Sequence, residues 1–206
     1  MTVLERKERE FKRREGEILC AALALFNRDD WQSVTIDQIA AKAEIGKGTV
    51  YKHFETKDEI YARLVMEFHR GVLAKISQLD LKGPALKAIG QTMDLFWRAN
   101  TEAPEYKRLI RYCRRDDFRR IIGPKLGAEM EALDAQFMEL IAPVIERGIR
   151  EGEIVKKPVA SVILGLHAAL IGVLEMEGIE CMETGMTAEQ QYREVREFAL
   201  RGIARR

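Results

Sequence analysis

Residues 35–60 constrain the fold of this chain more than any other stretch, because they contain two short helix patterns separated by a turn. Thr35 and Gln38 have capping-box spacing, in which a hydroxyl and an amide side chain satisfy backbone N–H groups at a helix start. Apolar residues then recur with helical spacing, and Gly46 is the turn residue best suited to a positive φ. A second short helix is expected over residues 47–53. The stretch predicts a helix-turn-helix, whose second helix is sized for a DNA major groove.

The exposed side of that second helix is expected to carry groups that bind phosphate oxygens. A second capping-box pattern, Thr56 to Glu59, places Lys57 in the first turn of the next helix, where the helix dipole also favours an anion. Val50 and Phe54 are instead expected in the core, and a solvated side chain is the alternative for Lys52. The candidate DNA-binding residues are Thr35, Lys47, Gly48, Thr49, Tyr51, Lys52, His53 and Lys57.

The run from Gly48 to Phe54, GTVYKHF, together with Thr35, Ile39-Ala40, Ala43 and Lys57-Asp58, resembles the N-terminal signature of the tetracycline-repressor (TetR/AcrR) family of ligand-responsive transcriptional regulators. The resemblance implies base-edge contacts by Lys47 and Gly48, and phosphate contacts by Thr35, Thr49, Tyr51, His53 and Lys57. Two positions depart from it: Glu44 stands where the family usually has Gly, and Gly46 where it usually has a small polar residue. An operator sequence therefore cannot be carried over.

Composition limits the function classes. The chain has 206 residues, 47% of them hydrophobic and 33% charged, and a net charge of +1. It can bury a core as one large or two small domains, and DNA affinity must come from a local patch because there is no general basic field. The three cysteines lack C-x-x-C spacing, and the charged N-terminus lacks an apolar signal core, so a cytoplasmic location is expected.

Helical apolar spacing recurs along the whole chain, and no strand pattern emerges, which predicts an all-α fold of about nine helices. The expected parts are a three-helix helix-turn-helix DNA-binding domain over residues 1–55, a connecting helix over 56–80, and a larger helical ligand-binding and dimerisation domain over 81–206. Residues 4–15 are interpreted as a frayed extension of the first helix whose arginines and lysines can reach DNA, with a solvated helix start as the alternative. Pro143 is expected to kink the long helix that contains it.

Residues 158–174 are apolar nearly all round, which favours a wholly buried helix over a membrane span. Small residues along one side permit close approach of a second copy across a two-fold axis, and the resemblance also implies a four-helix dimer interface. The candidate dimer-interface residues are Ser161, Gly165, Ala168, Gly172, Tyr192, Val195 and Phe198.

A ligand pocket is expected where helix faces are richer in aromatic residues and Met than a bundle seam needs, although ordinary core is the alternative for each residue. The candidates are Met93, Phe96, Trp97, Tyr106, Ile110, Cys113, Met130, Phe137 and His167. As a group they favour a hydrophobic or amphipathic effector, such as a fatty-acyl compound, an aromatic or a cationic drug. The run RRDDFRR, residues 114–120, is interpreted as a solvated, mutually paired surface, with interdomain coupling or an anion clamp as alternatives.

No catalytic constellation emerges, because the histidines lack H-E-x-x-H spacing and neighbouring cysteine ligands. We therefore expect no enzyme activity, no cofactor and no metal site. The function predicted is a homodimeric, ligand-responsive repressor released by a small molecule from a palindromic double-stranded DNA operator, with no membrane partner. The alternative is a helical small-molecule carrier or enzyme without specific DNA binding.

Overall fold

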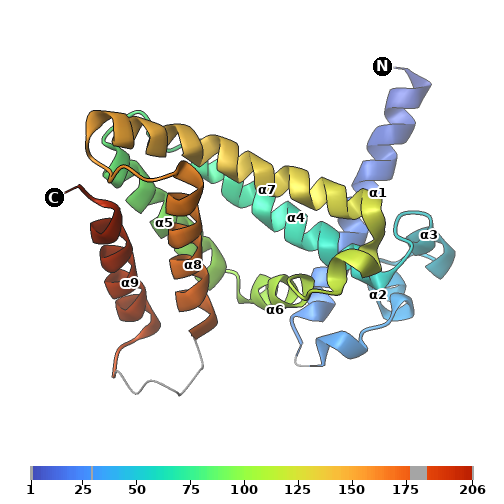
Figure 1. The fold of residues 1–206 in the computed structure, drawn as a ribbon. Coiled ribbons are helices and arrows are strands. Elements are labelled where there is room, and N and C mark those ends of the chain that lie inside the picture. Colours follow the sequence, from blue (N-terminus) through green and yellow to red (C-terminus); the bar gives the residue numbers. More distant parts are fainter. Residues whose placement is uncertain (1, 29, 177–184, 206) are drawn as a thin grey trace. The chain divides into compact units, whose positions relative to one another are not determined.

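The structure is a computed structural model that describes residues 2–28, 30–176 and 185–205; Cys181 lies outside these ranges. Across the described residues it contains helices and no β-strand beyond one isolated bridge between Ile154 and Ala204 (Figure 1). The prediction of an all-α fold is confirmed. The elements are α1 (Val3–Phe26), the 3-10 helix η1 (Trp31–Ser33), α2 (Ile36–Lys42), α3 (Lys47–Tyr51), α4 (Lys57–Ile76), α5 (Ala85–Thr101), α6 (Pro104–Cys113), α7 (Phe118–Glu151), α8 (Val159–Met176) and α9 (Ala188–Ile203).

Capping boxes fix the starts of α1, α2 and α9. The predicted box that begins at Thr35 is present, and Thr187 and Gln190 form another at the start of α9; in both, side chain and backbone are bonded in both directions. Residues 4–15 are not frayed, because Thr2 and Glu5 form a capping box and α1 is helical from Val3; residues 4–13 are exposed, which agrees with the alternative of a solvated helix start. At α4 only half of the predicted box forms, since Glu59 N–H donates to the Thr56 hydroxyl while the Glu59 carboxylate accepts from another residue.

The departure from helical geometry in α7 falls at Gly123 and not at Pro143. Gly123 has φ 75° and ψ 171°, while the rest of the helix keeps helical dihedral angles. Pro124 follows directly, and a residue before proline is disfavoured in the α conformation, so the break occurs where glycine can take an angle closed to other residues. Pro143 removes only one backbone donor, which the helix accommodates without leaving helical angles.

The described chain divides into two compact units that do not follow sequence order. Unit 1 contains Met1–Phe68 and Pro104–Glu131, and unit 2 contains His69–Ala103 and Ala132–Arg206. Helix α6 and the first part of α7 therefore pack with the N-terminal helices. The functional boundaries expected at residues 55 and 80 remain predictions.

Unit 1 is held together by a chain of aromatic contacts from four different helices and η1. Tyr61 on α4 packs against Phe26 at 4.7 Å, against Trp31 at 5.3 Å and against Tyr112 at 5.3 Å between ring centroids. Tyr112 also contacts Phe118, whose side chain is fully buried. The run RRDDFRR is thus not a solvated surface throughout, because Phe118 joins the core.

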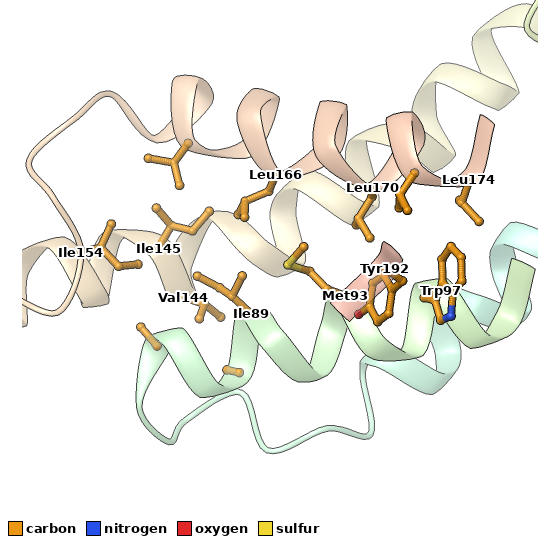
Figure 2. Close-up of a cluster of buried hydrophobic side chains, with 14 residues drawn as sticks. Ile89, Met93, Trp97, Val144, Ile145, Ile154, Leu166, Leu170, Leu174 and Tyr192 are labelled. Carbon is orange, nitrogen blue, oxygen red and sulfur yellow. The ribbon is translucent and has the colours of Figure 1, made fainter. Parts of the chain in front are cut away.

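Unit 2 has an apolar core formed by α5, α7, α8 and α9, shown in Figure 2. Trp97 on α5 stacks on Tyr192 of α9 with centroids 4.6 Å apart and ring planes 5° apart. The Tyr192 hydroxyl donates to Asp94 at 2.7 Å, and the Trp97 indole donates to Glu189 at 2.9 Å. These bonds satisfy the polar ends of two large buried rings and fix α9 against α5.

Helix α8 is not wholly buried in the protomer, contrary to expectation. One stripe, Val162, Leu166, Leu170, Val173 and Leu174, enters the core, while Leu164 on another face is 68% exposed. The helix is long and apolar enough to cross a membrane by composition alone, with 28% of its residues buried. Helix α8 is apolar on nearly every side because one stripe packs in the core of unit 2 and a second apolar face, which includes Leu164, lies outside that core.

Candidate DNA interface

Helices α2 and α3 and the turn between them form the predicted helix-turn-helix. Val50 on α3 is fully buried and Phe54 is 1% exposed, so one side of the short helix is fixed in the core of unit 1. The opposite side leaves Lys47, Gly48 and Tyr51 exposed, as the predicted recognition surface requires. Burial of one face thus determines which side chains a DNA groove can meet.

The turn before α3 uses a different residue for its left-handed position than expected. Glu44 has φ 55°, whereas Gly46 has φ −71° and caps the helix start. A left-handed conformation is unfavourable for a residue with a Cβ atom. The signal was present in the sequence, because Glu44 occupies the position where the resembling family usually has Gly.

Thr35 and Lys57 have roles within the protein at positions where the resemblance implies phosphate contacts. The Thr35 hydroxyl accepts from Gln38 N–H at 3.2 Å at the start of α2. The Lys57 ammonium donates to the backbone carbonyls of Gln32 at 2.6 Å and Val34 at 3.0 Å. Burial lowers the pKa of Lys57. Lys57 therefore ties the segment before α2 to the start of α4, which positions the helix-turn-helix.

His53 follows α3 and packs inside unit 1. Its ring lies 4.0 Å from that of Phe11 on α1, centroid to centroid, and burial lowers its pKa. The Nδ1 atom is buried without a hydrogen-bond partner. This contact ties the N-terminal part of α1 to the end of the helix-turn-helix. Sequence reasoning missed it, since Phe11 stands alone among charged residues.

The exposed cations differ in whether another side chain already engages them. Lys47 forms an ion pair with Asp37, 2.7 Å between Nζ and Oδ2. The side-chain ammonium groups of Lys52 and Lys42 have neither an ion pair nor a hydrogen bond within the part of the chain that the structure describes. The role of Asp37 was not predicted, because its partner lies ten positions away and only the folded turn brings the two together.

The candidate pocket residues are divided between the two units. Met93, Phe96, Trp97, Phe137 and His167 belong to unit 2, whereas the others belong to unit 1. Met93 and Trp97 are buried in the unit 2 core, Phe137 lies 6.1 Å from His69 ring to ring, and His167 is exposed on α8. Those in unit 1 are Tyr106, which stacks on Phe68 at 4.8 Å, the buried Ile110 and Cys113, and the half-buried Met130.

The candidate dimer residues lie on the outer side of α8 and α9, with one exception. Ser161, Gly165, Ala168 and Gly172 are exposed on α8, Val195 is half-buried, and Phe198 on α9 is 82% exposed. Tyr192 instead lies within the protomer, stacked on Trp97. Among the described residues, no group of three or more His, Cys, Asp or Glu side chains is arranged to hold a metal ion.

Comparison with known proteins agrees with this geometry. Residues 18–64, which contain the helix-turn-helix, match the sequence model of the bacterial regulatory proteins of the tetR family. The chain is 23% identical to the HTH-type transcriptional repressor KstR2 of Rhodococcus jostii strain RHA1 over 139 residues, 68% of this chain and 67% of the repressor. It is 27% identical to KstR2 of Mycobacterium tuberculosis strain CDC 1551 / Oshkosh, over 68% of each chain.

The fold is shared along nearly the whole length with solved structures. The transcriptional regulator FadR from Bacillus subtilis, solved in complex with stearoyl-CoA, superposes with a TM-score of 0.73 at 15% identity, covering 92% of this chain and 99% of FadR. A bacterial regulatory protein of the tetR family from Rhodococcus RHA1 gives 0.72 at 21% identity, with 94% and 98% covered. The helix-turn-helix, its match to the family model and the shared fold lead to one conclusion: residues 18–64 form a DNA-binding domain like that of the tetR family of bacterial regulatory proteins, and the chain as a whole has the fold of solved regulators of that family.

Proposed function

We propose that the protein is a homodimeric cytoplasmic repressor that binds a near-palindromic operator and leaves it when a hydrophobic or amphipathic small molecule binds. The observation that carries the DNA-binding part is the exposed face of α3, where Lys47, Gly48 and Tyr51 stand opposite the buried Val50. Lysine side chains, hydroxyl groups and a closely approachable glycine backbone suit base edges and phosphates.

The exposed apolar side chains of α8 and α9 support a dimer. Leu164 and Phe198 are 68% and 82% exposed, and the neighbouring small residues of α8 let a second helix approach closely. Two copies related by a two-fold axis would present two recognition helices to half-sites about one helical turn apart. The operator is accordingly close to palindromic.

For the effector, we propose a fatty-acyl compound, with an acyl-CoA as the first candidate. Support comes from the shared fold of the stearoyl-CoA-bound FadR and from the large, half-buried apolar side chains of Phe96 and Phe137 in unit 2. Release requires that the effector bind the DNA-free arrangement more tightly, because equal affinity for both arrangements shifts nothing. Thermal stabilisation by stearoyl-CoA but not by free CoA tests this choice, and equal stabilisation by the two would contradict it.

A Lys47→Ala, Tyr51→Ala double variant tests the DNA-binding face. Both side chains are exposed, so the variant should fold and dimerise normally while losing operator affinity. A matched control is Lys75→Ala, which removes a lysine at the end of α4 in unit 2. Wild-type operator affinity in the double variant would contradict the assignment and favour the carrier alternative, which also predicts little salt dependence of DNA association.

A further inference from the structure

The ion pair between Asp37 and Lys47 joins the two helices of the helix-turn-helix across their turn. Asp37 lies in the first turn of α2 and Lys47 begins α3, and their side chains meet at 2.7 Å. The pair stands in solvent, with the Lys47 side chain 49% exposed and the Asp37 side chain 64% exposed. It therefore lies on the surface that DNA must approach, not in the packing of the domain.

Lys47 lies on α3 where the family resemblance implies a base-edge contact. In the free protein its charge is already balanced by the Asp37 carboxylate. The carboxylate raises the pKa of Lys47 through the hydrogen bond and its charge. Lys52 at the end of the same helix has no such partner within the described chain. DNA must take Lys47 away from Asp37, and the carboxylate left behind then faces phosphates.

We propose that Asp37 is a built-in competitor for DNA, which holds Lys47 in the free protein and must be displaced when the protein binds. This inference rests on the proposed DNA-binding function and adds a residue that weakens binding. On DNA that lacks the operator sequence, Lys47 can pair with a phosphate in place of a base edge. A neutralised lysine then contributes little net counterion release, because the freed Asp37 takes up a cation when Lys47 moves to the phosphate. Asp37 should therefore lower both the affinity for DNA and its dependence on salt.

The test compares Asp37→Asn with wild type on a duplex of scrambled sequence, since phosphate contacts supply nearly all of non-specific binding. Dissociation constants are measured by fluorescence anisotropy over a series of KCl concentrations. Removal of the carboxylate charge should tighten binding about two- to fivefold at low salt, the range of an exposed ion pair. It should also steepen the slope of log affinity against log salt by about 0.9 per protomer, one added phosphate contact.

Two further variants separate competition from a general charge effect. Glu44→Gln removes one negative charge from the same turn, where the Glu44 carboxylate has no partner among the described residues and Gln can keep the same backbone conformation. It should change affinity less than Asp37→Asn and should act equally with or without Lys47. In a Lys47→Gln background, Asp37→Asn should increase DNA affinity by no more than Glu44→Gln does. Circular dichroism confirms that each variant is folded.

The proposal is overturned if Asp37→Asn keeps the wild-type affinity and salt slope, or if its effect persists in full without Lys47. It is also overturned if Asp37→Asn weakens binding, because Asp37 would then contact DNA itself. A folded wild-type protein without salt-dependent DNA binding gives a different result, since it contradicts the proposed function itself. The two failures are therefore distinguishable.

Discussion

Replacement of Lys57 by Met tests whether this lysine positions the helix-turn-helix or acts only by binding a DNA phosphate. Met keeps an unbranched apolar side chain but removes the ammonium that donates to the carbonyls of Gln32 and Val34 at 2.6 and 3.0 Å. Each bond contributes about 0.5–1.5 kcal/mol when solvent has partial access, so the variant should lose about 1–3 kcal/mol of unfolding free energy. The ammonium also lies 5.8 Å from the centroid of the Tyr61 ring, a cation–π contact whose loss would lower the unfolding free energy further.

Urea denaturation followed by circular dichroism measures this loss, and Lys52→Met is the matched control. The Lys52 side chain is exposed at the end of α3 and has no ion pair or hydrogen bond in the described chain, so its replacement should leave stability unchanged. If Lys57→Met is as stable as Lys52→Met and loses only DNA affinity, the positioning role is refuted. The phosphate contact implied by the family resemblance would then be the whole role of Lys57.

Four other changes have defined outcomes. Phe118→Ala, at a fully buried position, should lower the unfolding free energy in urea by about 3–5 kcal/mol; a loss below about 1 kcal/mol would mean that α7 does not anchor in unit 1. Glu44→Gly should stabilise the protein by about 1 kcal/mol in the same assay, since Gly accepts φ 55° without strain; a destabilised variant would contradict this. Burial holds the pKa of His53 below its unfolded value of 6.5, so protonation favours the unfolded state and stability falls as the pH drops below about 6.5. His53→Asn should therefore reduce the difference in thermal midpoint between about pH 7.5 and pH 5.5. An unchanged difference would exclude His53 as its source. Phe198→Glu should leave helicity intact and give a monomer in sedimentation velocity, whereas a persistent dimer would place the interface elsewhere.

Features that depend on residues close together in the chain could be predicted from the sequence. The capping box at Thr35 involves residues three apart, so propensity and hydrogen-bonding chemistry were enough to identify it. The buried side of α3 followed from the apolar spacing that placed Val50 and Phe54 in the core. The predicted recognition face was then the opposite, exposed side of α3.

Contacts between distant segments could not be predicted in the same way. Tyr112 donates to Asp58 at 2.8 Å across 54 positions, and this bond helps pack α6 with the N-terminal helices. No periodicity in α6 indicates which unit it joins, because an amphipathic helix shows that it has a partner but not which one. The same limit hid Phe118, whose charged neighbours on both sides suggested a surface.

The backbone of the turn was misassigned for a physical reason of another kind. Glycine was expected at the left-handed position because it has no Cβ penalty, yet Glu44 occupies it at φ 55°. The surrounding packing of α2 and α3 fixes the turn and overrides the local preference. Such an override is invisible in a single sequence unless a family resemblance marks the position.

Selection of bound sequences from a random pool of duplex DNA, at low and at physiological salt, tests the central claim most directly. The account predicts enrichment of a near-palindrome of about 15–20 base pairs, as two major-groove half-sites one turn apart require. The enriched sequence should lose affinity for the Lys47→Ala, Tyr51→Ala double variant. Failure of the folded, ligand-free protein to enrich any sequence at either salt would contradict the assignment of a sequence-specific dimeric repressor.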